Sequence, residues 1–188
     1  MIDAVRTARM LLRPWQASDA AALLAVLEAN QAHLGDWIPR RVSEPAPLPD
    51  MTRRLTEYGA ELAADRAWRY ALIDAESGAV LGEVSLFPRD AAGRVDFAAA
   101  DRVEIGYWLR GDRTGEGLVT EATEAVLAMV SALPTLAHAE IRCDERNHAS
   151  AAIPRRLGFM LSSSLHSPAV VQGDPPEVLQ VWTRSLRQ

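Results

Sequence analysis

A strand that runs through a glycine-rich turn into a helix occupies residues 102–122 and constrains the fold more than any other stretch. Apolar and polar side chains alternate along residues 103–109, which is the period of a half-buried strand. Gly111, Gly115 and Gly117 then interrupt the pattern, and apolar residues recur at helical spacing from Leu118 onward. Because a helix start presents unpaired N–H groups and about half a positive charge to one point, this order of elements predicts an anion site.

The glycine-rich turn does not match the two commonest nucleotide loops. A Walker loop needs a lysine after its glycines, and the chain contains no lysine. The dinucleotide fingerprint needs a third glycine where this chain has Thr120. Glu140 lies near the place of the ribose-binding acid of that fingerprint, but a charged strand residue is expected to be solvated. A plain turn between strand and helix is the alternative to a phosphate site.

A second strand and a second helix follow the first pair. Pro134 ends the first helix because its ring cannot continue the hydrogen-bond ladder. Residues 137–143 alternate as a strand, so strand, helix and strand predict two parallel neighbours joined by a right-handed crossover. Asn147 is a good N-cap for the next helix, and Gly158 stands where a left-handed cap is expected.

Six patterns lie in order along nearly the whole chain. They are TARMLLRPW at 7–15, Ser18-Asp19, His33-Leu34-x-x-Trp37, EIGYWL at 104–109, DRTGEG at 112–117 with Thr120-Glu121-Ala122, and NHAS at 147–150 with Leu157-Gly158-Phe159. Together they resemble the GCN5-related N-acetyltransferase (GNAT) superfamily, and most of all its RimJ/RimL branch of ribosomal-protein N-terminal acetyltransferases. The resemblance implies one N-acetyltransferase domain over residues 1–188.

The resemblance also implies a fold and an activity. The expected fold is α/β, with a central mixed, mostly antiparallel sheet, one splayed parallel strand pair and helices on both faces. The expected reaction moves an acetyl group from acetyl-CoA directly to a primary amine, first of all a protein or peptide N-terminal α-amine. The alternatives are a small-molecule amine (amino acid, polyamine or aminoglycoside-like) and a non-catalytic acyl-CoA-binding or sensing domain. The acyl chain length of the donor stays open.

Acetyl-CoA, the acyl donor, is expected on the turn, on the preceding strand and on the second helix. The residues that the resemblance assigns to it are Tyr107, Trp108, Leu109, Arg113, Thr114, Gly115, Glu116, Gly117, Leu118 and Asn147. Thr114 replaces an arginine usual in the family, and Arg113 is expected to take over its phosphate contact. Glu116 places a carboxylate in the loop, and Pro154 replaces the tyrosine that serves many relatives as general acid.

Glu104 and Ser150 are the expected catalytic residues. Glu104 would take the amine proton, because a protonated amine cannot attack a thioester; the alternative is an exposed strand carboxylate. Ser150 would protonate the leaving thiolate, and otherwise it only satisfies backbone groups at a helix start. By resemblance, His33, Trp37 and Glu104 shape the acceptor pocket, although Trp37 is equally interpreted as a core anchor.

Composition limits the remaining classes of function. A net charge of −5 argues against general nucleic-acid binding. One cysteine excludes an internal disulfide and fits a reducing cytoplasm, and Cys143 is interpreted as a packing residue rather than a nucleophile. No apolar run approaches the ~20 residues of a membrane span, and the four histidines lack zinc spacing. We therefore expect a cytoplasmic monomer or homodimer with no metal, whose partner is an amine-bearing acceptor.

The rest of the chain alternates between periodic segments and proline-containing loops. Strands are expected at 9–14, 70–74, 79–87 and 178–186, helices at 18–29 and 51–64, and loops at 40–50, 89–100 and 162–176.

Overall fold

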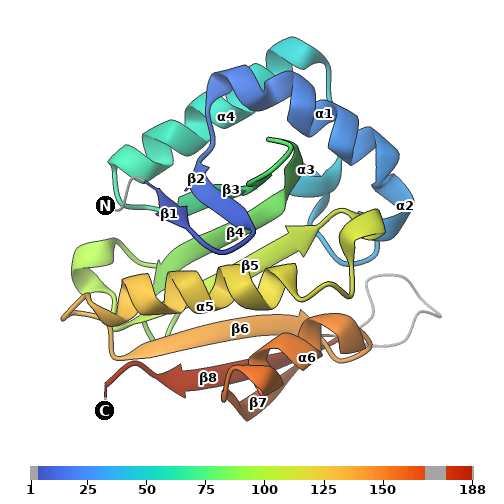
Figure 1. Cartoon of the computed structure of the whole chain (residues 1–188). Coiled ribbons are helices and arrows are strands. Elements are labelled where there is room, and N and C mark those ends of the chain that lie inside the picture. The colour runs from blue at the N-terminus through green and yellow to red at the C-terminus, as the bar shows by residue number, and fades with distance from the viewer. Residues whose placement is uncertain (1–3, 168–176, 188) are drawn as a thin grey trace.

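The computed structural model describes residues 4–167 and 177–187, which form one mixed sheet of eight strands with helices on both faces (Figure 1). The strands are β1 (Val5–Arg6), β2 (Met10–Pro14), β3 (Trp68–Asp74), β4 (Val80–Arg89), β5 (Arg102–Leu109), β6 (His138–Asp144), β7 (Met160–Ser167) and β8 (Glu177–Ser185). The helices are α1 (Ala20–Ala29), α2 (Gln31–Leu34), α3 (Arg40–Ser43), α4 (Leu48–Ala63), α5 (Leu118–Ser131) and α6 (His148–Arg156).

The sheet order is β1-β2-β3-β4-β5-β6-β8-β7, and every neighbouring pair is antiparallel except β5 and β6. This arrangement confirms the expected α/β fold with one parallel pair. The helix α5 connects the two parallel strands, as the strand–helix–strand pattern predicts.

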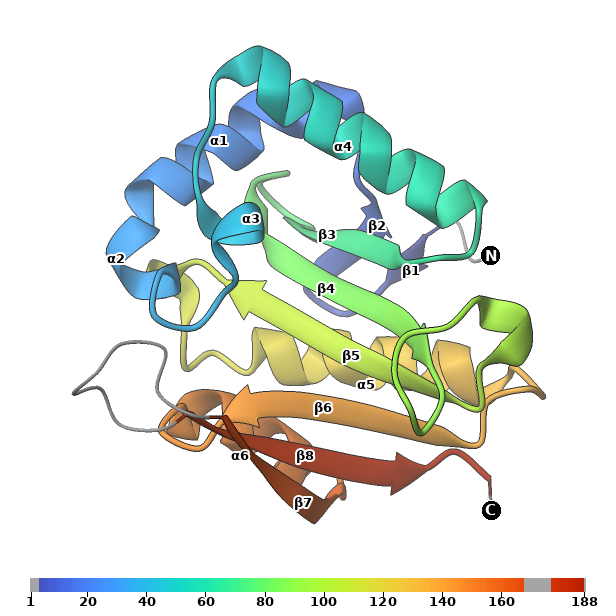
Figure 2. The ribbon, with the colours of Figure 1, turned by 180° about the vertical axis from the view of Figure 1, so that it is seen from behind.

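The parallel pair separates along its length. Pairing of β5 with β6 runs from Arg102↔His138 to Ile105↔Ile141 and stops there, whereas β5 stays paired with β4 as far as Leu109. Figure 2 shows the two arrows diverging toward their carboxyl ends. Among the described residues, the β6-facing backbone edge of the last part of β5 therefore has no strand partner.

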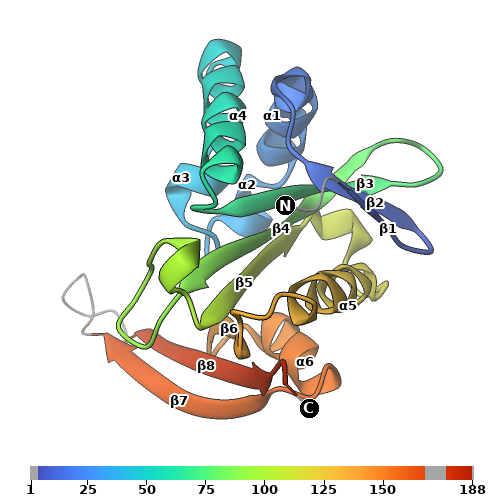
Figure 3. The ribbon, with the colours of Figure 1, turned by 90° about the vertical axis from the view of Figure 1, so that its left-hand side faces the viewer.

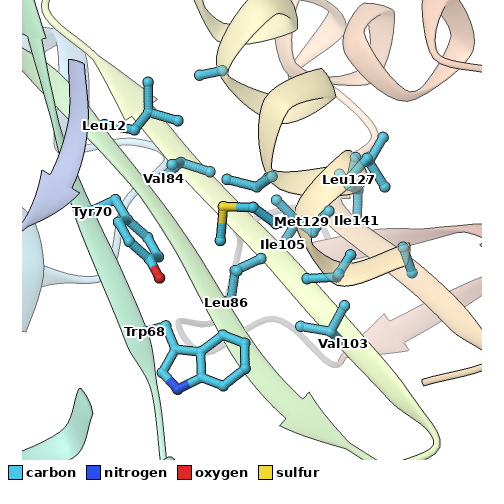
Figure 4. Packing of buried hydrophobic residues seen from close by; sticks show 14 of the residues in the cluster. Leu12, Trp68, Tyr70, Val84, Leu86, Val103, Ile105, Leu127, Met129 and Ile141 are labelled. Carbon is cyan, nitrogen blue, oxygen red and sulfur yellow. The ribbon is translucent and has the colours of Figure 1, made fainter. Parts of the chain in front are cut away.

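Two hydrophobic cores lie on opposite faces of the sheet. The helices α1 and α4 cover one face, and α5 and α6 cover the other (Figure 3). Alternation along β5 assigns its side chains: Val103 and Ile105 join the core under α5, and Trp108 joins the core under α1 and α4. Figure 4 shows the first core, where Ile105 packs among residues of neighbouring strands and of α5.

Helix α5 has the apolar face that its sequence predicts. Leu118, Ala122, Val126 and Val130 recur on one side, and each is at most 1 % exposed. Full burial of the Leu and Val side chains contributes about 1.5–3 kcal/mol each. This face holds the start of α5 firmly against the sheet, which fixes the glycine-rich turn beside β5.

Two expected loops contain regular structure instead. The segment 40–50 includes α3 and the first residues of α4, and Pro49 is tolerated because it falls in the first turn of that helix. The segment 162–176 begins within β7, an edge strand whose residues Met160 to His166 are all exposed. An edge strand with no buried side lacks the apolar alternation that marks a strand in sequence. The remainder of that expected loop, 168–176, lies outside the described residues.

In the described part of the chain no helix is long and apolar enough to cross a membrane.

Candidate active site

A cleft of about 1400 Å³ follows the gap between β5 and β6. Its walls come from β4, β5, β6, the turn before α5, the start of α6, and the segment from α2 to α3. Of the residues that the sequence assigned to donor, acceptor or chemistry, all except Arg113 line this cleft. The fold thus gathers into one cavity residues that lie more than a hundred positions apart in sequence.

The turn before α5 exposes a row of backbone donors to the cleft. Gly115 and Gly117 have φ of 81° and 78°, a left-handed conformation that residues with a Cβ rarely adopt, and Gly117 is the N-cap of α5. Within the described chain, no acceptor receives a hydrogen bond from the N–H groups of residues 115–120. Unpaired amides at the start of a 14-residue helix fit a diphosphate, so this turn suits the coenzyme.

Arg113 does not line the cleft and is paired within the chain, and its expected contact with phosphate stays a prediction. Its Nε and NH2 donate to the carboxylate of Glu116 at 2.9 and 3.1 Å, and NH1 lies 3.3 Å from Oδ2 of Asp74. A second arginine also binds the turn. Arg9 donates a hydrogen bond to the Glu116 carbonyl and forms an ion pair with Glu121 at 2.7 Å. Glu116 is therefore held in the turn by Arg113, rather than being free in solvent.

The start of α6 carries the other polar groups near the gap. Oδ1 of Asn147 accepts from the Ser150 N–H at 2.9 Å, as an N-cap does, and its Nδ2 has no partner among the described residues. One side chain can therefore cap the helix and donate into the cleft. Pro154 lies inside α6, is buried, and does not line the cleft.

Tyr107 reaches across the gap from β5 to α6. Its hydroxyl donates to the Ser150 carbonyl at 3.0 Å, and Oγ of Ser150 donates to the Tyr107 hydroxyl at 3.3 Å. Burial raises the pKa of Tyr107 well above its ordinary value, because the charged phenolate is poorly solvated there. The phenol is neutral at physiological pH and fixes the Ser150 hydroxyl in the cleft.

Glu104 is partly buried and paired, not an exposed strand carboxylate. Its side chain is 16 % exposed, and Oε2 lies 2.7 Å from NH1 of Arg89 and 3.7 Å from Nε of Arg142. It lines the cleft on the same side of β5 as Trp108, as the alternation predicts. The carboxylate is thus held in place by Arg89 and remains in contact with the cleft.

Glu140 is buried, whereas its position on a strand led us to expect a solvated carboxylate. It stands opposite Glu104 on β6, but its side chain is only 4 % exposed and pairs with Arg102 and Arg142, both at 3.0 Å. The cost of burying a carboxylate is offset by two guanidinium partners. Glu140 does not line the cleft and is not solvated as the sequence suggested.

The acceptor side of the cleft contains His33 and Trp37, both exposed. Trp37 is 40 % exposed, whereas the other four tryptophans, Trp15, Trp68, Trp108 and Trp182, are 4–6 % exposed and serve the cores. The interpretation of Trp37 as a core anchor is therefore wrong, and its indole lies on the wall where an acceptor would enter.

Sequence reasoning missed a buried ion pair beneath this wall. Glu83 on β4 is 4 % exposed; it accepts from Arg69 at 3.0 Å and from Nε1 of Trp15 at 2.8 Å. Burial raises the pKa of Glu83, and the adjacent guanidinium opposes that shift. The signal was present in the sequence, because Glu83 is the one charged residue in the mainly apolar run of 80–87.

Two further expectations concern the thiol of Cys143 and the binding of a metal ion. Cys143 is 7 % exposed within the core under α5, and burial raises the pKa of its thiol, which disfavours the reactive thiolate. Among residues 4–167 and 177–187, no group of three or more His, Cys, Asp and Glu side chains is placed to hold a metal ion.

Comparison with known families identifies the class of enzyme to which this chain belongs. The family model described as the acetyltransferase (GNAT) domain matches residues 9–160, which covers most of the chain. The chain belongs to the GNAT acetyltransferase family. It is an acetyl-CoA-dependent N-acetyltransferase, and the expectations for the enzyme class and the acyl donor are confirmed.

Relatives of this GNAT enzyme agree with the resemblance to the RimJ/RimL branch. The probable N-acetyltransferase YjcK of Bacillus subtilis is 25 % identical over 148 residues, covering 79 % of this chain and 78 % of the relative. The putative ribosomal N-acetyltransferase YdaF of the same organism is 25 % identical over 169 residues, which cover 86 % of this chain and 84 % of YdaF.

Solved structures share the fold of this GNAT enzyme at low sequence identity. The RimL acetyltransferase of ribosomal protein L7/L12, in complex with coenzyme A, superimposes with a TM-score of 0.81 at 19 % identity, covering 97 % of this chain and 98 % of RimL. RimJ of Mycobacterium smegmatis superimposes with a TM-score of 0.79 at 23 % identity, covering 97 % and 87 %. The microcin C7 self-immunity acetyltransferase MccE, in complex with acetyl-CoA and AMP, superimposes with a TM-score of 0.79 at 18 % identity. The match covers 95 % of this chain and 93 % of MccE.

Proposed function

We propose that this enzyme transfers the acetyl group directly from acetyl-CoA to the α-amine of a protein or peptide N-terminus. The observation that carries the proposal is the continuity of one cleft from the amide row of 115–120, through the β5–β6 gap, to the exposed Trp37. A donor at one end and an acceptor entering past Trp37 would meet beside Glu104 and Ser150. The neighbours named for the ribosomal proteins L7/L12 support a protein N-terminus as acceptor.

Binding of the donor is assigned to backbone groups and one side chain. The amides of 115–120 would hold the diphosphate, which can approach because Gly115 and Gly117 lack a Cβ. Nδ2 of Asn147 would donate to the pantetheine arm lying in the β5–β6 gap. The unpaired edge of Tyr107 to Leu109 would donate to the thioester oxygen and stabilise the negative charge that develops there.

Proton transfer is assigned to the two polar residues at the gap. Glu104 takes a proton from the acceptor ammonium, and the neutral nitrogen attacks the thioester carbon. The carbon–sulfur bond then breaks, Ser150 gives its hydroxyl proton to the thiolate, and water passes to Ser150 the second proton that the nitrogen loses on becoming an amide; Glu104 returns its own proton to solvent. Tyr107 positions Ser150 through their mutual hydrogen bonds. No acetyl-cysteine is formed, because Cys143 is buried as a neutral thiol.

A small-molecule amine is the second acceptor class, and the charge of the acceptor wall favours it. Arg41, Arg69, Arg89 and Arg94 line that part of the cleft against three carboxylates, those of Asp36, Glu83 and Glu104. Such a wall also suits a compact acceptor that carries negative charge. The neighbour MccE, whose structure holds AMP beside acetyl-CoA, shows that a fold of this kind accommodates a nucleotide.

The test is acetyl-CoA turnover by the full chain, measured as release of free thiol. The acceptors are peptides that differ in their first residue, the same peptides with a blocked N-terminus, and an amino acid, a polyamine and an aminoglycoside. Mass spectrometry of the products locates the acetyl group. We expect acetylation of the free peptides on the α-amine and none of the blocked peptides.

If only the small amines are acetylated, the acceptor is a small-molecule amine and the proposal of a peptide acceptor is wrong. Binding of coenzyme A in calorimetry without turnover of any amine would favour a non-catalytic binding domain. We also propose that the enzyme is cytoplasmic, which its single, free cysteine supports, and that it is a monomer or homodimer.

A further inference from the structure

Arg94 is a cation held in the cleft by an aromatic ring instead of a carboxylate. It lies in the loop between β4 and β5, and its guanidinium carbon is 3.8 Å from the centroid of the Phe87 ring. Within the described chain its guanidinium has no ion pair and no hydrogen bond. Stacking on a ring fixes the position of a guanidinium while leaving its five N–H donors free.

Three more arginines surround Arg94, and only two of them are neutralised. Arg69, which also stacks on Phe87 at 4.9 Å, pairs with Glu83, and Arg89 pairs with Glu104. Arg41 on α3 has no carboxylate partner among residues 4–167 and 177–187. One part of the cleft therefore contains two guanidiniums that lack a counter-charge.

The electrostatic environment agrees with this imbalance. Burial lowers the pKa of Arg94, and among its charged neighbours only Glu104 opposes that shift, while Arg41, Arg69 and Arg89 add to it. Arg41 and Arg94 are both exposed along the cleft, where solvent screens part of their repulsion and an anion between them would offset the rest. Both free guanidiniums line the same cleft as Glu104, the residue that we assign to the acceptor amine.

We propose that Arg41 and Arg94 form a subsite for an anionic group, a carboxylate or a phosphate, carried by the acceptor next to its reacting amine. The inference rests on the proposed function, because it takes the acceptor to bind on this wall. A guanidinium fork matches both anions by two parallel hydrogen bonds. The acceptor class is thus an amine with a nearby negative charge, such as an N-terminus followed by an acidic residue.

Calorimetry tests the subsite without any turnover. The probes are Ala-Glu-Ala amide against Ala-Gln-Ala amide, for a peptide carboxylate, and phosphoethanolamine against ethanolamine, for a phosphate on a small amine. They are titrated into the full chain with coenzyme A present. In at least one pair we expect the anionic probe to bind ten times or more tighter than its neutral partner, and the pair that responds identifies the source of the anion.

Variants connect that preference to the two arginines. Arg94→Gln and Arg41→Gln should each reduce the preference to threefold or less, and in turnover the loss should be in KM rather than kcat. The matched control is Arg40→Gln, because Arg40 is on the same helix, is exposed, pairs with Glu44, and does not line the cleft. The Arg40→Gln variant should prefer the anionic probe over the neutral one as strongly as the wild type does.

The outcomes separate this inference from the proposed function. A charge preference that the two variants remove supports the subsite even when no peptide is acetylated, and in that case only the proposed reaction fails. Equal affinity within both pairs, or no binding of either anionic probe at millimolar concentration, overturns the subsite. A preference that persists in both variants overturns it as well, because the anion then binds elsewhere.

Discussion

Arg113 and Glu116 form a two-contact ion pair across the turn that leads into α5, with nitrogen–oxygen distances of 2.9 and 3.1 Å. The pair has opposite consequences for the turn and for the donor. It braces the backbone whose amides face the cleft, yet it places a carboxylate beside the proposed diphosphate site and neutralises Arg113, one of two arginines that bind this turn. Glu116 is the member of the pair that lines the cleft.

Removing the carboxylate should therefore strengthen donor binding. Glu116→Gln keeps the side-chain size and frees Arg113, and we expect coenzyme A affinity in calorimetry to rise about two- to fivefold, the size of charge effects at a helix start. Asp112→Asn is the matched control, because Asp112 pairs with Arg110 in the same turn and does not line the cleft. Unchanged or weaker binding by Glu116→Gln would show that the ion pair helps the donor.

Gly117 should be required for donor binding rather than for folding. A Val side chain at this N-cap intrudes where the diphosphate approaches, so Gly117→Val should weaken coenzyme A binding by at least tenfold, about 1.4 kcal/mol. It also strains the backbone, because φ is 78°. Gly78→Val controls for that strain, since Gly78 has φ of 73° in the β3–β4 turn and does not line the cleft. Equal affinity in both variants would remove the basis for placing the diphosphate here.

Glu104 should control the rate and not the binding of the donor. Glu104→Gln cannot accept the amine proton, so kcat should fall about 10²–10⁴-fold and the acidic limb of the pH–rate profile should disappear. Coenzyme A affinity should stay as in the wild type. Glu140→Gln is the control, because Glu140 stands opposite on β6 but does not line the cleft. Turnover of Glu104→Gln at the wild-type rate would mean that water removes the proton.

Ser150 and Tyr107 should act as one unit in protonating the thiolate. Ser150→Ala should lower kcat roughly tenfold, less than loss of the base, because water can replace a hydroxyl donor. Tyr107→Phe should lower kcat by a similar or smaller factor, since it removes the hydroxyl to which Oγ of Ser150 donates. If the two act as a unit, the double variant is no slower than the slower single variant. Independent, multiplicative losses would contradict the coupling.

Asp74 should make the fold acid-sensitive. Hydrogen bonds from the Ser77 amide and hydroxyl, together with Arg113, hold its pKa at about 2, below the ordinary 3.8. Because the folded-state pKa is depressed, the stabilisation is present above about pH 4 and is lost as the pH falls through about 2. The urea midpoint should drop over that window, and Asp74→Asn should flatten part of the drop. An identical pH dependence in both proteins would contradict this role.

Local sequence signals determined the part of the fold that carries the donor site. Alternation over 103–109, the glycines of the turn, the apolar face of α5 and the Asn147 cap each specify structure within a few residues of themselves. These signals placed β5, the turn, α5, β6 and α6 in the right order and predicted the parallel pair. They suffice because helix starts, turns and strand periods depend on neighbours in sequence.

Side-chain partners were decided only by the tertiary structure. Glu140 finds Arg102 at a separation of 38 residues, and whether Arg113 faces phosphate or Glu116 depends on how the turn packs. The exposed edge strand β7 has no pattern to reveal it, because pairing alone makes it a strand.

The arginines of the acceptor wall are another feature that local sequence does not reveal. Its arginines come from α3, β3, β4 and the following loop, and nothing in the sequence near Arg41 or Arg94 says that both lie in one cleft. Periodicity tells which face of a strand a residue occupies, but it does not tell which distant charge stands opposite. The sequence alone therefore indicated the family, the glycine-rich turn and the order of the elements, whereas folding decided which charges are neutralised and which are left unpaired.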